Sequence, residues 1–208
     1  MPDWEELRDW LRERLGLLVA LALAVAVGLY FWLDRPMKQP PGVLAPAEPL
    51  QELLPGNESW QVRTWRLTAL ATFEIQARVL SRERYRFDTG SDFCPLDLAL
   101  GWGPMSDSAV LKAIHISQSD RWYHWSTSST PPIPPDQITA HSANMHMIPA
   151  NDRVKRILLG FREGEVIHLK GKLVRVDRPD GYSLVSSLSR LDSGAGSCEV
   201  VWVEEAGS

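Results

Sequence analysis

The hydrophobic positions of the chain are most concentrated in one unbroken run near its start. Residues 16–33, GLLVALALAVAVGLYFWL, contain no charged side chain. A helix of this length rises about 27 Å, close to the ~30 Å hydrocarbon core of a bilayer. Tyr30 and Trp32 lie where aromatic rings favour the membrane interface. The run therefore predicts a transmembrane helix over residues 16–33, with the lipid bilayer as its partner.

The residues on either side of this run predict its orientation. Apolar side chains recur three and four positions apart in residues 1–15, which indicates an amphipathic helix that continues into the span. Three arginines precede the span, whereas only Arg35 and Lys38 follow it closely, and this bias favours a cytoplasmic N-terminus. We therefore expect a cytoplasmic leader, a single pass through the inner (plasma) membrane, and a periplasmic or otherwise extracytoplasmic C-terminal domain.

Proline dominates the next segment. Residues 34–59 contain six prolines and predict an extended, semi-rigid linker. The same segment includes Ala45-Pro46-Ala47, which has the small-x-small pattern of a signal-peptide cleavage site. A cleaved signal peptide is therefore the alternative to a membrane anchor. The long apolar run, the acidic leader and the distance of this motif from the run favour the anchor.

Residues 60–205 show the alternation that is typical of half-buried strands. In residues 72–79 the apolar side chains take the odd positions and the polar ones the even positions. The apolar phase of a later strand shifts at Gly171-Lys172, which predicts a β-bulge there. We expect a mainly β domain with short α inserts (α+β), folded as a small bent sheet or OB-like barrel. Further strands are predicted at 61–67, 114–118, 121–127, 165–177, 182–188 and 197–204, and helices at 95–100, 107–113 and 151–161.

Charge composition narrows the class of partner. The chain has 22 basic and 26 acidic side chains, of which 19 and 21 lie outside the leader. A domain this close to neutral has no electrostatic reason to bind nucleic acid. The sequence contains no strong cofactor or metal motif, so neither is expected. The partner that we expect is an envelope protein or another envelope component.

Three stretches of the sequence are specific enough to suggest a relationship. Residues 98–107 (LALGWGPMSD), 142–150 (SANMHMIPA) and 186–199 (SSLSR, then Asp192, Gly194, Gly196 and Cys198-Glu199) resemble an uncharacterised family of proteobacterial envelope-anchored proteins. The resemblance covers about residues 73–203. It implies a place in the cell envelope and a shared fold, but no reaction, because the family has no assigned activity.

Two functions from different classes are compatible with these observations. The first is a membrane-tethered binding or accessory module of the envelope. The second is a hydrolase, because Asp88-Thr89-Gly90 has the form of the aspartic-protease loop, in which two carboxylates share one proton. A single such loop requires a dimeric, retropepsin-like enzyme, with residues 157–160 as the supporting apolar segment. The heavily charged residues 82–86 argue against this, and an ordinary Asx-type turn is the alternative.

Polar side chains of the predicted domain supply further candidates. His146 shares a strand face with Asn144 and Ser142, and such a row lines a pocket or faces solvent. Residues 121–125, which include His124, are rich in aromatic rings that stack on sugars or peptides, or pack in the core. The weak catalytic candidates are Asp88, His124, Asn144, His146 and Arg190.

The two cysteines, Cys94 and Cys198, are expected to lie in the same extracytoplasmic domain. An oxidising compartment favours a disulfide between them. The alternatives are two buried free thiols, or a nucleophilic Cys94 at the start of the predicted helix 95–100.

Overall fold

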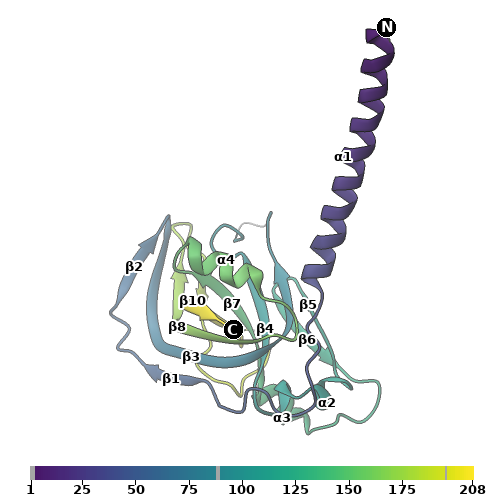
Figure 1. The fold of residues 1–208 in the computed structure, drawn as a ribbon. Coiled ribbons are helices and arrows are strands. Elements are labelled where there is room, and N and C mark those ends of the chain that lie inside the picture. Colours follow the sequence, from purple (N-terminus) through teal and green to yellow (C-terminus); the bar gives the residue numbers. More distant parts are fainter. Residues whose placement is uncertain (1–2, 88–89, 195) are drawn as a thin grey trace. The chain divides into compact units, whose positions relative to one another are not determined.

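The structure, a computed structural model, describes residues 3–87, 90–194 and 196–208 (Figure 1). The chain divides into two compact units, and the boundary in the sequence falls between Pro36 and Met37. The first unit is dominated by the helix α1 (Trp4–Asp34), whose N-terminus is capped by the Asp3 carboxylate accepting from the Glu5 N–H at 3.2 Å. The helix is long and apolar enough to cross a membrane. The predicted continuous helix of leader and span is therefore confirmed.

The second unit is organised around a closed barrel of five strands (Figure 1). Around the barrel the order is β3, β4, β7, β10 and β8, and β8 pairs back with β3. All neighbours are antiparallel except β7 and β10, which are parallel. The barrel strands are β3 (Trp65–Arg84), β4 (Leu96–Gly101), β7 (Ser142–Pro149), β8 (Val166–Asp177) and β10 (Glu199–Gly207).

This arrangement is that of an OB-type barrel. The helix α4 (Asp152–Gly160) connects the third barrel strand to the fourth, and the Asn151 side chain caps it by accepting from the Val154 N–H at 3.0 Å. A five-stranded Greek-key barrel of this kind binds its ligands on the face of its second and third strands, here β4 and β7, and on the adjoining loops. The predicted mainly β fold with an OB-like barrel is confirmed.

Shorter elements extend this barrel. The strands β1 (Leu50–Leu53) and β2 (Ser59–Val62) pair with β3, and β9 (Ser183–Val185) pairs with β8. The connection from β4 to β7 carries the 3-10 helix η1 (Gly103–Ser106), the helices α2 (Ser108–Leu111) and α3 (Pro135–Ala140), and the hairpin of β5 (His115–Ser119) and β6 (Trp122–Ser126). Asp120 and Arg121 make the hairpin turn with positive φ values of 51° and 65°, as a two-residue type I′ turn requires.

Two apolar clusters hold the barrel together. Alternate residues of the strands fill the interior, so that Phe73, Leu98 and Met145 are almost fully buried. A second cluster lies on the outer face of several barrel strands. There Ile148 and Val174 pack with apolar residues that lie outside the barrel strands. Several barrel strands are therefore covered on both faces.

Burial on both faces explains one wrong prediction. Residues 95–100 were predicted as a short helix, but residues 96–101 form β4, in which every side chain is buried. A strand that is covered on both faces loses its alternation, and the helix-forming tendency of Leu and Ala is overridden by pairing with β3 and β7. The predicted helices at 107–113 and 151–161 correspond to α2 and α4.

The proline-rich segment also differs from its prediction. Residues from Met37 on belong to the second unit rather than to a free spacer. Ala45 is fully buried, its N–H donates to the Ser106 hydroxyl at 3.0 Å, and Glu48 accepts from the Trp102 indole at 2.8 Å. Proline rigidity lets this segment lie extended along the domain and satisfy its backbone there.

The bulge predicted at Gly171-Lys172 lies in the partner strands instead. The strand β8 runs on without interruption, whereas β10 has its register shift at Glu204 and β3 has one at Leu70. The change of apolar phase within β8 reflects the second cluster, because Val174 and Val176 are buried on the outer face of the barrel.

Candidate functional site

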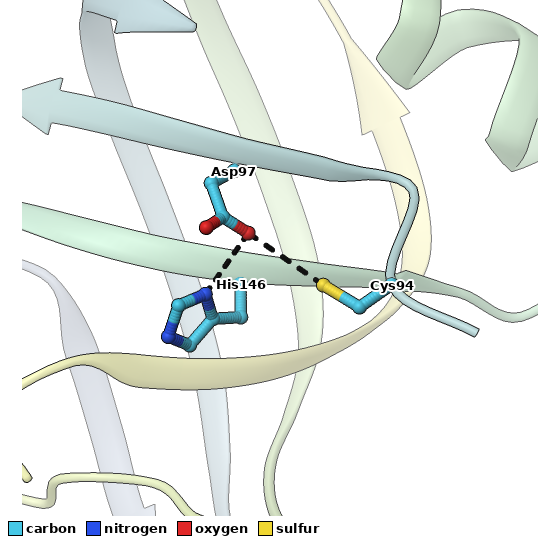
Figure 2. Close-up of side chains that lie close together, drawn as sticks. All are labelled: Cys94, Asp97 and His146. Carbon is cyan, nitrogen blue, oxygen red and sulfur yellow. Dashed lines mark hydrogen bonds and ion pairs between the residues drawn. The ribbon is translucent and has the colours of Figure 1, made fainter. Parts of the chain in front are cut away.

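The candidate site lies on the outer face of β4, β7 and β10. Asp97 of β4 is directly opposite His146 of β7, so both side chains emerge on the same face. Asp97 is fully buried and His146 is 5 % exposed. The His146 Nδ1 atom lies 2.9 Å from Asp97 Oδ1, an ion-pair distance, although it does not make an in-line hydrogen bond (Figure 2). A buried carboxylate thus orients the imidazole ring.

Three further side chains fix the carboxylate of Asp97. The Tyr85 hydroxyl donates to Oδ2 at 3.1 Å, and Arg121 Nη1 lies 3.3 Å from Oδ1. The Cys94 thiol points toward the same oxygen at 3.7 Å (Figure 2). The Arg121 guanidinium also stacks over the Tyr85 ring, 3.9 Å from its centroid. Asp97 therefore has a fixed orientation, and its negative charge lies between the Arg121 guanidinium and the His146 imidazole.

His146 also lies near Cys198, which precedes β10 and influences the protonation of the imidazole. Burial alone would lower the pKa of His146, but the interactions with Asp97 and Cys198 outweigh it and raise that pKa to about 9. The imidazole is therefore largely protonated at neutral pH. The Asn144 amide contacts the same thiol, since its Nδ2 atom lies 3.8 Å from Cys198 Sγ.

The β5–β6 hairpin partly covers this face. Gln118 donates to Asn144 Oδ1 at 2.6 Å, and the Tyr123 hydroxyl is hydrogen-bonded to Ser142 at 3.0 Å. These contacts hold the hairpin above β7 and leave a pocket of about 360 Å³ between the hairpin and the segment that leads into β10. Aromatic and polar side chains line this pocket, including Trp122, His124, Asn144, Arg190, Asp192 and Cys198.

A second buried pair lies at the pocket. Arg190 Nη2 is 3.0 Å from Glu199 Oε1, and Glu199 is 1 % exposed. Burial raises the pKa of Glu199 to about 8, although the neighbouring Arg190 charge opposes this. The Arg190 Nε and Nη1 atoms and Glu199 Oε2 are buried and have no hydrogen-bond partner among the described residues. Arg190 and Glu199 thus form a buried ion pair beneath the pocket lining.

The structure brings most of the predicted site residues together. His124, Asn144 and Arg190 all line the pocket, and His146 is linked to it through Cys198. Asp88 lies outside the described residues, so the protease loop remains a prediction. The apolar segment 157–160 that was to support the loop forms the end of α4.

Sequence reasoning missed Asp97, the central residue of the cluster. Its signal was present, since it is a carboxylate inside the apolar run LDLAL. The wrong helix at 95–100 hid this signal, because a helix does not pair position 97 with position 146. Arg121 and Glu199 were also missed, because only the folded chain brings each of them to its ion-pair partner.

The two cysteines belong to the same cluster but are free thiols in this structure. The predicted disulfide is therefore not formed here. Cys94 precedes β4 and Cys198 precedes β10, the two strands that flank β7. Cys94 donates toward Asp97 Oδ1, and Cys198 lies near His146. Burial raises the pKa of the Cys94 thiol well above its usual range, which argues against the predicted nucleophilic Cys94.

The donor atoms of Cys94, Asp97 and His146 all lie within 4.8 Å of one another. Such a grouping is compatible in composition with a thiolate- and imidazole-binding metal. However, Asp97 Oδ1 already faces the imidazole at 2.9 Å and the Arg121 guanidinium at 3.3 Å. A cation at this oxygen would be repelled by the arginine, so we assign no metal here.

Comparison with family models, with curated proteins and with solved structures found no match to this chain. The class of protein is therefore defined by its own fold and site. It is an OB-type barrel with a polar, aromatic-lined pocket on the face of β7 and β10, in a chain that also has a helix able to span a membrane.

Proposed function

We propose that the protein is a membrane-tethered, extracytoplasmic module of the cell envelope that binds a saccharide-type envelope component in the pocket beneath the β5–β6 hairpin. The observation that carries this proposal is the pocket itself, which occupies part of the face that OB-type barrels use for ligands. Barrels of this type bind oligonucleotides or oligosaccharides. The near-neutral composition of the domain argues against an oligonucleotide, so we take a saccharide as the ligand class.

The chemistry of the lining supports an uncharged, polyhydroxylated ligand. Trp122 is 40 % exposed and offers an aromatic face for stacking. Arg190 and Asp192 also line the pocket, and their charges have opposite signs. An ionic ligand of either sign would meet one unfavourable charge, whereas hydroxyl groups can donate to one side chain and accept from the other.

Binding is tested with the full chain in lipid nanodiscs, using an N-acetylglucosamine trisaccharide and maltotriose as probes. We expect saturable quenching of tryptophan fluorescence by at least one probe. Trp122→Ala should weaken binding about tenfold, because one stacking contact contributes about 1.4 kcal/mol. The matched control is Tyr182→Ala, which removes an exposed aromatic ring outside the pocket and should leave the affinity unchanged. Absence of saturable binding to both probes, or an equal loss in both variants, contradicts the proposed ligand class.

The proposed topology has its own test. With the N-terminus of α1 in the cytoplasm, a reporter fused after Ser208 should be active only on the outer side of the membrane. Alkaline phosphatase, which folds only outside the cytoplasm, should therefore be active there, and a cytoplasm-only fluorescent reporter should be dark. The reverse pattern would overturn the extracytoplasmic location of the domain while leaving the binding result unaffected.

A further inference from the structure

We propose that Cys198 is the nucleophile of a Cys198–His146–Asp97 constellation that performs acyl transfer on a small ester bound in the pocket. The inference uses the pocket of the proposed function but does not depend on its saccharide ligand. It makes the chain an enzyme, and it uses a different residue from the predicted protease loop.

The order of the three groups carries the proposal. Asp97 lies at the His146 Nδ1 atom. Cys198 precedes β10, the strand that pairs with β7 on its other side, and its thiol lies 3.8 Å from the Nδ2 atom of Asn144, on the same face of β7 as His146. A nucleophile, a base and an acid that orients the base are the components of a catalytic triad, whatever the fold that carries them. The residues come from three neighbouring barrel strands or their ends, so the pairing of the sheet fixes their spacing.

Access to the pocket distinguishes the two cysteines. Cys198 lines the pocket and is partly exposed, whereas Cys94 is buried and points toward oxygen acceptors, Asp97 Oδ1 and the Leu96 carbonyl. Those acceptors disfavour the Cys94 thiolate. Cys198 instead faces an imidazole and the Asn144 amide, which both stabilise negative charge on sulfur.

The charged groups around the imidazole favour an ion pair of thiolate and imidazolium. Asp97 is at Nδ1, Arg121 lies behind Asp97, and Glu199 follows Cys198 in the chain. The pKa of His146 is raised to about 9, because the interactions with Asp97 and Cys198 outweigh the effect of burial, so the ring is largely protonated at neutral pH. The ring is then already able to protonate a leaving group.

The reaction balances without another reactant except water. The Cys198 thiolate attacks the carbonyl carbon of the ester, a sulfur–carbon bond forms, and the bond to the alkoxy oxygen breaks. The imidazolium of His146 gives its proton to the departing alkoxide. Water then attacks the thioester while His146 takes one of its protons, and the carboxylic acid leaves as the thiolate is restored.

Reactivity of the thiol is the first test. The full chain in detergent with EDTA is labelled with iodoacetamide across pH 5–9, and the modified peptides are identified by mass spectrometry. We expect Cys198 to react at pH 6 at least tenfold faster than an ordinary thiol, whose pKa is about 8.5. His146→Gln should slow that reaction at least tenfold at pH 6 and return its pH midpoint to the ordinary value. Tyr182→Ala, which removes an exposed ring outside the pocket, should leave the rate and the midpoint unchanged.

Acyl transfer is the second test, with p-nitrophenyl acetate as the probe. We expect release of about one p-nitrophenolate per chain in a burst, together with an acetyl group on the peptide that contains Cys198. Asp97→Asn should reduce the burst rate, and circular dichroism identifies any variant that fails to fold. His146→Gln, judged in the same way, provides the independent test.

Several outcomes would overturn this proposal. An ordinary pH midpoint for Cys198 in the native chain, or an acetyl group on Cys94, would contradict the assigned nucleophile. A Cys198–Cys94 disulfide that prevents labelling without reductant would do the same. The nucleophile is judged by labelling and acetylation of Cys198, and saccharide binding by tryptophan quenching of Trp122→Ala against Tyr182→Ala, so failure of the nucleophile and failure of the proposed binding function give different results.

Discussion

Gly171→Ala should lower the free energy of unfolding by about 3 kcal/mol or more, because the new methyl group has no space. A Cβ atom at this position would lie 1.9 Å from the Trp202 carbonyl oxygen and 3.0 Å from its carbon. Both atoms belong to the backbone of β10, which cannot rotate away as a side chain can. The bulge of β10 at Glu204 is in contact with this position, since the Glu204 nitrogen would be 3.2 Å away.

The position of Gly171 in the barrel increases the expected effect. It pairs with Phe73 of β3 and with Val203 of β10, so β8 is held on both sides. A shift of β8 away from Trp202 would disturb its ladder with β3 as well. The matched control is Gly160→Ala at the end of α4, where nothing lies within 4 Å of the added atom.

The measurement is urea or thermal unfolding of the full chain in detergent, followed by tryptophan fluorescence, which reports the second unit through Trp60, Trp102 and Trp202. Gly160→Ala should leave stability unchanged or raise it slightly, because alanine is the better helix former. A free energy of unfolding of Gly171→Ala within about 1 kcal/mol of the native value would show that β8 and β10 do not approach each other this closely.

The strands β3 and β8 show which part of the fold could be predicted from the sequence. The alternation in residues 72–79 predicts a strand because one face is apolar and the other polar, and the structure has β3 there. The closure of β8 against β3 has no local signal, because it depends on pairing between residues about a hundred positions apart, such as Ile75 and Leu169. The sequence around Gly171 indicated a departure from regular alternation, but it did not indicate that the bulges lie in the paired strands β3 and β10.

The candidate site was predictable to the same extent. Asn144 and His146 alternate with apolar residues, so their common face could be predicted. Asp97 could not be placed opposite His146, because its strand is buried on both faces and has no alternation. The hairpin turn at Asp120-Arg121 was located to within one residue, yet its position over β7 depends on contacts of Gln118 and Tyr123 with another strand. Side-chain patterns report local periodicity, whereas a pocket requires distant segments to meet.

The fully buried carboxylate of Asp97 leads to the second large effect. Asp97→Ala should lower the free energy of unfolding by about 3–5 kcal/mol, the usual result of removing one partner from a buried ion pair. The change leaves the Arg121 guanidinium and the protonated His146 ring near each other without the intervening negative charge. It also removes the acceptor of the Tyr85 hydroxyl, which is 3.1 Å away in the native chain.

Two further variants separate charge from shape. Asp97→Asn keeps an oxygen acceptor and nearly the same volume, so its loss of stability should fall between those of the native chain and Asp97→Ala. Asp92→Ala is the matched control, because Asp92 pairs with Arg63 at 3.2 Å but both side chains are largely exposed. Such surface pairs contribute about 0–1 kcal/mol, so this variant should unfold almost as the native chain does. Equal effects of Asp92→Ala and Asp97→Ala in the same unfolding assay would show that Asp97 is not a buried centre of charge. His146 would then have no buried carboxylate to orient its ring, and the acyl-transfer proposal would lose one of its three residues.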